Sequence, residues 1–160
     1  MLFVCQIFDF YKTLSVQEGF PIQYSHFQQL VGISEITQKN ILNALEGIFL
    51  LRRFAIEGGR KGFVFYLEDQ AEAVFLKNQI QNNDTKYFQD FEGIIYRNCR
   101  VQLEYHLGIS YQFFHFLTSG GARVPVAVRT AEGILGFIPI RDDVITSSQR
   151  ASAHSFLKCY

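Results

Sequence analysis

The sequence contains no tryptophan and has only three cysteines among its 160 residues. Cys5, Cys99 and Cys159 are odd in number and far apart, and no CxxC pair occurs. This pattern argues against a disulfide framework and against a zinc site, and it is typical of proteins in a reducing cytosol. We therefore expect a cytoplasmic protein that uses no metal ion and no cofactor.

Charge of one sign is not in excess either, because 15 basic and 15 acidic residues give a formal net charge of zero. A domain built mainly to hold a nucleic-acid backbone usually carries a basic excess. Long apolar runs are missing as well, since Asp9 and Lys12 interrupt the apolar start of the chain. That start also lacks the basic leader and the cleavage site of a signal peptide. We expect a core helix there and no membrane partner.

Apolar residues, by contrast, are abundant. The sequence is 48% hydrophobic and 16% aromatic, which allows a packed core and excludes global disorder. The many aromatic side chains indicate either a dense core or an apolar face left for a partner. The length suits one domain or two small ones.

The clearest structural pattern lies between residues 30 and 67. A short helix is expected to end at Gly32, and Ser34 is suited to cap the next helix. Apolar residues then recur with the spacing of one helical face at Ile41, Leu45, Ile48 and Phe49. Residues 52–56 and 63–67 have the composition of strands joined by a glycine-rich turn. Helix, tight turn, helix and β-hairpin together make a winged helix-turn-helix.

The rest of the chain predicts further helices and a three-stranded meander. Helices are expected at residues 2–16, 24–31, 68–78, 87–106 and 146–160, and strands at 111–117, 123–128 and 134–140. The polar residues 81–85 mark a domain boundary. We predict an α+β protein with a winged-helix domain at 1–80 and a small α/β domain, ordered helix, three strands and helix, at 86–160.

Helical spacing also predicts which side chains face inward. In the helix at 68–78 they are Ala71, Val74 and Phe75. The helix at 87–106 has apolar residues spread widely enough to predict burial over much of its surface. Ser147 and Ser148 are expected to cap the last helix.

Both halves together resemble the C-terminal domain of unknown function that follows the ATPase module in a large prokaryotic family of predicted AAA+ ATPases. The family's LG-hydrophobic-S motif, a Thr in the next helix and an LE pair correspond to Val31-Gly32-Ile33-Ser34, Thr37 and Leu45-Glu46. An aromatic residue and an Asp near a strand end, and an E-x-x-V/I-Y pattern, correspond to Tyr66, Asp69, Glu92, Ile95 and Tyr96. The resemblance covers essentially the whole chain and implies an ATPase module upstream of Met1.

The phosphate-binding loop GxxxxGK[ST] of such an ATPase module does not occur in this sequence. The glycine-rich segment Gly58-Gly59-Arg60-Lys61-Gly62 has the wrong spacing, and it is expected to lie in the hairpin. We therefore expect that this chain alone neither binds nor hydrolyses ATP.

The last part of the family's domain is similar to a PD-(D/E)XK, restriction-endonuclease-like core, which holds a divalent metal ion with a Glu, an Asp and an E-x-K motif. Glu92 matches the first carboxylate. The resemblance places the other two motifs at Arg123-Val124-Pro125 and Arg141-Asp142-Asp143, where an alignment shift restores one carboxylate but not the pair. A lone Glu92 cannot hold a catalytic Mg²⁺, so we expect a degenerate nuclease scaffold; Glu92 is catalytic only if that site is active.

In winged helices that bind DNA, the second helix enters the major groove and basic residues hold phosphates. The candidate nucleic-acid-binding residues are Gln38, Lys39 and Asn43 on the exposed face of that helix, and Arg60 and Lys61 in the hairpin turn. The basic excess of this segment is small, which leaves a protein-interaction role open beside DNA binding. The four histidines lack metal-ligand spacing, and His115 is expected to be a hydrogen-bonded core residue.

Three functions remain open from the sequence. The leading hypothesis is a non-catalytic C-terminal interaction domain of a predicted AAA+ ATPase, whose partner is its own upstream ATPase module, another protein or DNA, with homo-oligomers as a further option. The second is a standalone winged-helix transcription regulator that binds DNA. The third is a metal-dependent PD-(D/E)XK nuclease.

Overall fold

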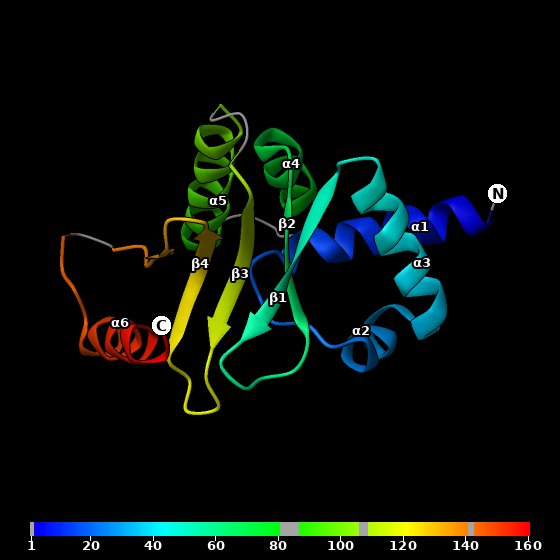
Figure 1. Ribbon diagram of the computed structural model, residues 1–160. Coiled ribbons are helices and arrows are strands. Elements are labelled where there is room, and N and C mark those ends of the chain that lie inside the picture. The colour runs from blue at the N-terminus through cyan, green and yellow to red at the C-terminus, as the bar shows by residue number, and fades with distance from the viewer. Residues whose placement is uncertain (1, 81–86, 106–108, 141–142) are drawn as a thin grey trace.

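A computed structural model describes residues 2–80, 87–105, 109–140 and 143–160. The chain is a mixed α+β protein in which helices surround a central sheet (Figure 1). The helices are α1 (Leu2–Val16), α2 (Tyr24–Val31), α3 (Glu35–Gly47), α4 (Gln70–Ile80), α5 (Tyr87–Tyr105) and α6 (Ser147–Cys159). The strands are β1 (Leu51–Glu57), β2 (Phe63–Leu67), β3 (Tyr111–Leu117), β4 (Arg123–Thr130) and β5 (Ile134–Phe137).

One five-stranded sheet, ordered β2-β1-β3-β4-β5, runs through both halves of the chain. The β1–β2 pair is antiparallel and the β1–β3 pair is parallel, whereas the meander β3-β4-β5 is antiparallel throughout. The parallel pairing sets Ala55 opposite Phe114 and so joins the hairpin to the meander. The boundary predicted at residues 81–85 lies outside the described residues.

Both faces of the sheet are covered, which explains why all five residues of β2 are buried. Val64 and Tyr66 pack with Tyr96 of α5 on one face. Phe63, Phe65 and Leu67 pack on the other face with side chains of α1, α3 and α4. Farther along that second face, Phe156 of α6 covers β3 and β4 in a separate cluster with Phe114, Phe116, Val124 and Ala127.

A β-bulge at Pro125 changes the phase of β4. Phe114 pairs with Ala127, but Phe116 pairs with Val124, so β4 has one more residue than β3 across this interval. Proline has no N–H to donate to the ladder, which makes a bulge the natural place for it. The carbonyl oxygen of Pro125 is free to accept hydrogen bonds from side chains on the α5 side of the sheet.

Predicted and observed faces differ for three helices. In α3, Leu42 and Leu45 are buried, but Ile48 and Phe49 are exposed. The prediction for these two was wrong because the helix ends at Gly47 and Phe49 adopts a left-handed φ of 59°, so helical spacing no longer applies.

In α4, Ala73 and Leu76 are buried, whereas the predicted Ala71, Val74 and Phe75 are exposed. The helix begins only at Gln70, and its buried side is the one that packs on α1. In α5, the predicted burial over much of the surface was also wrong: one side carries the core contacts, and Phe91, Ile94, Val101 and Tyr105 are exposed.

The start of α6 also differs from the prediction, because its cap is Thr146 and not Ser147 or Ser148. The Thr146 hydroxyl accepts from the Gln149 N–H, and the Gln149 side chain accepts from the Thr146 N–H, which makes a capping box. No helix within the described ranges has the length and apolar character needed to cross a membrane.

Candidate functional site

The predicted cap of α3 is confirmed, because the Ser34 hydroxyl accepts from the Thr37 N–H at 3.2 Å. One predicted contact residue of this helix is not where the sequence suggested. Gln38 is fully buried, and its Nε2 donates to the carbonyl oxygen of Ile33 at 2.6 Å. The prediction that Gln38 lies on the exposed face was wrong, because the amide is used to close the turn between α2 and α3.

Lys39 and Asn43 are exposed as predicted, but both already have partners. Lys39 Nζ lies 2.7 Å from Glu35 Oε1, and Asn43 Oδ1 accepts from Arg53 Nη2 at 2.6 Å. Arg53 is also paired with Glu46, 2.5 Å away. The cations on and beside α3 are therefore neutralised within the molecule.

The side of α3 that faces solvent carries no net charge. Ile36, Asn40, Asn43 and Gly47 follow one another at spacings of four, three and four residues, and all are exposed. Ile36 is 74% exposed, and at the end of the helix Ile48 and Phe49 are 64% and 72% exposed. We call Ile48 and Phe49 the α3 tip. Large apolar groups left in water next to neutral polar ones are typical of surfaces that bind other proteins.

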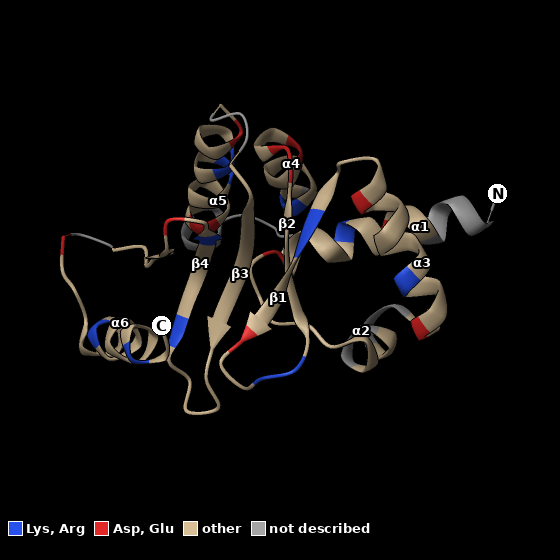
Figure 2. Ribbon diagram, viewed as in Figure 1, with Lys and Arg blue, Asp and Glu red and all other residues tan. Residues whose placement is uncertain are grey.

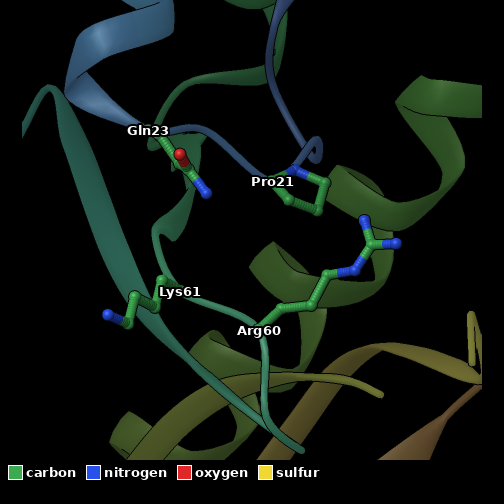
Figure 3. A pocket seen from close by; sticks show the side chains of 4 residues that line it. All are labelled: Pro21, Gln23, Arg60 and Lys61. Carbon is green, nitrogen blue, oxygen red and sulfur yellow. The ribbon is translucent and has the colours of Figure 1, made fainter. Parts of the chain in front are cut away.

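Arg60 and Lys61, the remaining predicted contact residues, lie in the turn between β1 and β2, where Figure 2 shows a basic segment. Both are exposed. They line a pocket of about 310 Å³ together with Pro21 and Gln23 (Figure 3). We call these four residues the wing pocket. Pro21 and Gln23 were missed from the sequence because only the pairing of Ile22 with Phe63 brings their segment beside the turn.

Glu92 is the one carboxylate that the sequence assigns to a nuclease site. It belongs to α5 and is buried on the side of this helix that faces the sheet. Arg123 donates to both of its oxygens, with Nη1 2.7 Å from Oε1 and Nη2 2.6 Å from Oε2. The Tyr66 hydroxyl approaches Oε2 to 3.5 Å. Burial raises the pKa of Glu92, and the Arg123 guanidinium opposes that rise.

His115 lies beside this pair and is fully buried, so its predicted role as a hydrogen-bonded core residue is confirmed. Its Nδ1 is 2.9 Å from the Pro125 carbonyl oxygen, which makes Nδ1–H the donor and leaves Nε2 to accept from Arg123 Nε at 3.4 Å. Burial first, and then the Arg123 charge, lowers the pKa of His115 to about 4.

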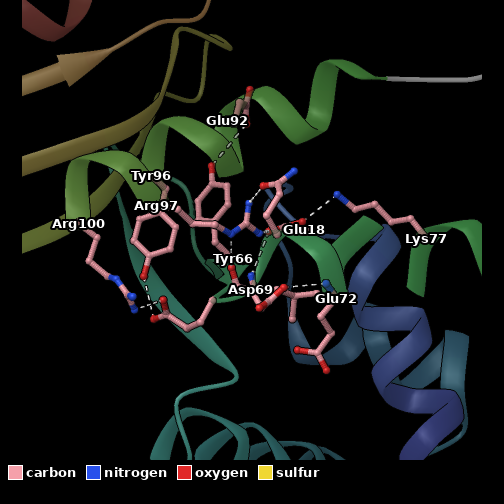
Figure 4. Close-up of polar contacts among 12 residues, drawn as sticks. Glu18, Tyr66, Asp69, Glu72, Lys77, Glu92, Tyr96, Arg97 and Arg100 are labelled. Carbon is pink, nitrogen blue, oxygen red and sulfur yellow. Dashed lines mark hydrogen bonds and ion pairs between the residues drawn. The ribbon is translucent and has the colours of Figure 1, made fainter. Parts of the chain in front are cut away.

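Two further carboxylates connect α5 to the rest of the chain, and Figure 4 shows the buried one, Glu18, with Arg97 and Lys77. Glu18 accepts from Arg97 Nη2 at 2.6 Å, from Lys77 Nζ at 2.8 Å and from the Leu67 N–H at 3.0 Å. Sequence reasoning missed this cluster, because Glu18 and Arg97 are 79 residues apart and no local pattern links them.

Glu68 forms the second cluster. It pairs with Arg52 at 3.2 Å and with Arg100, and it accepts from the Tyr96 hydroxyl at 2.9 Å. Because Arg52 belongs to β1 and Arg100 to α5, this carboxylate fastens α5 to the hairpin. The carboxylates of Glu18, Glu68 and Glu92 are therefore all engaged in ion pairs within the molecule.

The metal ligands of a PD-(D/E)XK core are not assembled in the part of the chain that the structure describes. No group of three or more His, Cys, Asp or Glu side chains there is placed to hold a metal ion. Pro125 stands where the Asp of the E-x-D strand is expected, and Arg141 and Asp142 lie outside the described residues. Asp143 is exposed.

Comparisons with protein-family models, with curated proteins and with solved structures find no match to this chain.

Proposed function

We propose that this chain is a non-catalytic interaction domain, the C-terminal part of a prokaryotic, cytoplasmic protein of the predicted AAA+ ATPase type. It combines a winged helix, α2-α3-β1-β2, with a degenerate PD-(D/E)XK-like scaffold, α5-β3-β4-β5-α6. The order of these elements and the antiparallel meander support this proposal. Because one continuous sheet includes strands of both parts, the two parts act as a single unit in this proposal.

The observation that carries the non-catalytic part is the pairing of Glu92 with Arg123. A metal-dependent nuclease needs carboxylate oxygens free to bind a divalent cation. Here a guanidinium donates to both oxygens of the only matching carboxylate, at 2.7 and 2.6 Å. Arg123 stands at the first position of the expected E-x-D motif and Pro125 at its Asp position, so this strand offers Glu92 a cation and supplies no second carboxylate.

The α3 surface favours a protein partner over DNA. A recognition helix that reads the major groove needs donors and cations free to reach bases and phosphates. In α3, Gln38 is buried and Lys39 is paired, while the α3 tip leaves two large apolar side chains in water. The partner in this proposal is the upstream ATPase module, with another protein or a second copy of the chain as the other options.

The reading frame upstream of Met1 gives the first test, because the proposal requires a GxxxxGK[ST] loop there. The ATPase module, expressed separately, is then titrated with the chain by calorimetry. We expect Ile48→Asp with Phe49→Asp to weaken binding at least tenfold. Val144→Asp with Ile145→Asp is the matched control, because these adjacent residues are also exposed, at 63% and 47%, and lie far from α3 in sequence. Equal weakening by both variants would refute a role for the α3 tip.

A second measurement addresses catalysis and DNA. Incubation of plasmid DNA with the chain and Mn²⁺ is expected to leave the plasmid intact. Cleavage that disappears in Glu92→Ala would overturn the non-catalytic assignment and support the nuclease. Fluorescence anisotropy of a labelled duplex at low salt tests DNA binding, and tight binding that depends on Lys39 and Asn43 would favour the standalone regulator.

A further inference from the structure

Two cationic residues that are adjacent in the sequence form no ion pair with a carboxylate. Nine Lys and Arg side chains in the described ranges pair with carboxylates: Lys12, Lys39, Arg52, Arg53, Lys77, Arg97, Arg100, Arg123 and Arg129. Within the same ranges, four basic side chains form no such pair: Arg60, Lys61, Arg150 and Lys158. Of these, only Arg60 and Lys61 are neighbours in the sequence, and only they line the wing pocket.

The turn that carries them is held at both ends by contacts that only glycine allows. At Gly62, with φ of 119°, a Cβ atom would lie 2.3 Å from the Ile22 carbonyl oxygen. At Gly58, with φ of 101°, it would lie 2.9 Å from the Leu117 carbonyl oxygen. Both approaches require a residue without a side chain. The turn is therefore fixed against the segment before α2 on one side and against the end of β3 on the other.

The first contact also builds the pocket. The Ile22 N–H donates to the Phe63 carbonyl at 2.8 Å, and the Phe63 N–H donates back at 3.1 Å. In this antiparallel exchange Gln23 lies beside Gly62, the residue that follows Lys61. Figure 3 shows the Arg60 side chain extending from the turn toward Pro21, the Lys61 side chain extending in the opposite direction, and Gln23 on the Lys61 side. The backbone thus brings two cationic residues and an amide to the lining of one pocket, and both cations reach a single anion there when their side chains turn inward.

We propose that the wing pocket binds a phosphate group. Arg60 offers a planar fork of N–H donors that matches two phosphate oxygens, Lys61 offers a mobile point charge, and the Gln23 amide offers neutral donors. None of the four residues that line the pocket is acidic, so none repels an anion. A fixed backbone lowers the cost of ordering these groups when the anion binds.

The phosphate has two chemical sources, a small phosphate ester and the phosphodiester backbone of a nucleic acid. The wing pocket and the α3 tip have no residue in common. Phosphate binding at the pocket and protein binding at the tip can therefore be lost separately. Both sources would use the same contacts in the pocket. The experiment distinguishes them by the ligand that is added to the protein.

The test is an ¹H–¹⁵N NMR titration of the full chain with sodium pyrophosphate, with sodium chloride added to a reference sample to equal ionic strength. We expect saturable shifts centred on Gln23 and on residues 59–62. Arg60→Gln with Lys61→Gln is expected to weaken the fitted affinity at least tenfold. The matched control is Arg150→Gln with Lys158→Gln, which removes the other two unpaired cations and is expected to leave the affinity unchanged.

Each remaining outcome counts for or against the proposal. Shifts that sodium chloride reproduces, shifts that do not saturate, or equal weakening by both double variants would overturn it. A labelled DNA duplex distinguishes the sources. Duplex binding that pyrophosphate displaces, and that is lost only in the Arg60 and Lys61 variant, supports the backbone phosphodiester. Pyrophosphate binding without duplex binding supports a small phosphate ester.

Discussion

Arg123 binds both carboxylate oxygens of Glu92, although the two residues are 31 positions apart. Arg123 Nη2 also donates to the Gly19 carbonyl oxygen at 2.8 Å, so one guanidinium joins α5, β4 and the loop after α1. The approach of this loop is close: a Cβ atom at Gly19 would lie 3.2 Å from Glu92 Oε2. The pair of Glu92 and Arg123 therefore holds three segments of the chain together.

Removing the guanidinium should cost more than removing a surface ion pair. Arg123→Met leaves a buried carboxylate without its partner, and we expect a loss of about 2–3 kcal/mol in the free energy of unfolding, measured by urea denaturation. Arg129→Met is the control. Its partner Glu57 and Arg129 itself are partly exposed, at 29% and 38%, so solvent screens this pair and the expected loss is clearly smaller than for Arg123→Met.

The Glu92→Gln variant and the double variant complete the cycle for this pair. If the two side chains stabilise the fold through one another, the double variant loses less than the sum of the single variants, with a coupling of about 1–3 kcal/mol. Additive losses would show that each side chain acts independently, which contradicts the role assigned to the pair.

His115 should make stability dependent on pH. Folded His115 stays neutral down to a pKa of about 4, whereas the unfolded chain takes up a proton at the ordinary value of about 6.5. Between these values the unfolded state binds more protons, so the free energy of unfolding falls as the pH falls. From pH 7.5 to pH 5 we expect His115 to contribute a loss of about 2 kcal/mol.

The comparison with His115→Gln isolates this contribution. Glu92, whose raised pKa acts in the opposite direction, is present in both proteins, so its effect largely cancels in the difference. Urea denaturation at the two pH values is expected to show a pH dependence about 2 kcal/mol smaller in the variant. The same pH dependence in both proteins would mean that His115 does not titrate in this range.

Local patterns in the sequence were sufficient for the secondary structure. The bounds of α1, α2, β2 and β3 agree with the prediction, because apolar spacing, Gly32 and the Ser34 cap act over a few residues. Long-range pairings were not accessible in this way. Nothing near Arg53 in the sequence shows that it neutralises α3, and nothing near Pro21 shows that it lines a pocket with Arg60. The sequence therefore suggested candidate residues, but it did not show which residues they contact.

The glycine at position 62 should be far less replaceable than the glycine at position 59. Both have a positive φ, 119° and 107°, so alanine strains the backbone at either position by about 1–3 kcal/mol. Only at Gly62 does the new Cβ also meet the Ile22 carbonyl oxygen, while nothing lies within 4 Å at Gly59. We expect Gly62→Ala to destabilise the fold by at least about 1 kcal/mol more than Gly59→Ala in urea denaturation. Similar losses would indicate that the turn is not held against Ile22.

Phe49 is the residue at which the fold and the proposed function conflict. It has a left-handed φ of 59° and is 72% exposed, so its side chain adds strain and little burial. Phe49→Gly should therefore raise the free energy of unfolding by about 0.5–1 kcal/mol, whereas replacement of a residue by glycine usually lowers it. Ile48→Gly is the control, because Ile48 is as exposed but has a φ of −101°, and this variant should lose stability.

A gain at Phe49 alone, measured by thermal and urea denaturation, would mean that the chain retains a destabilising aromatic residue in water, as expected if a partner covers it. A loss at Phe49 would show that the ring stabilises the isolated fold and would remove this argument for the α3 tip.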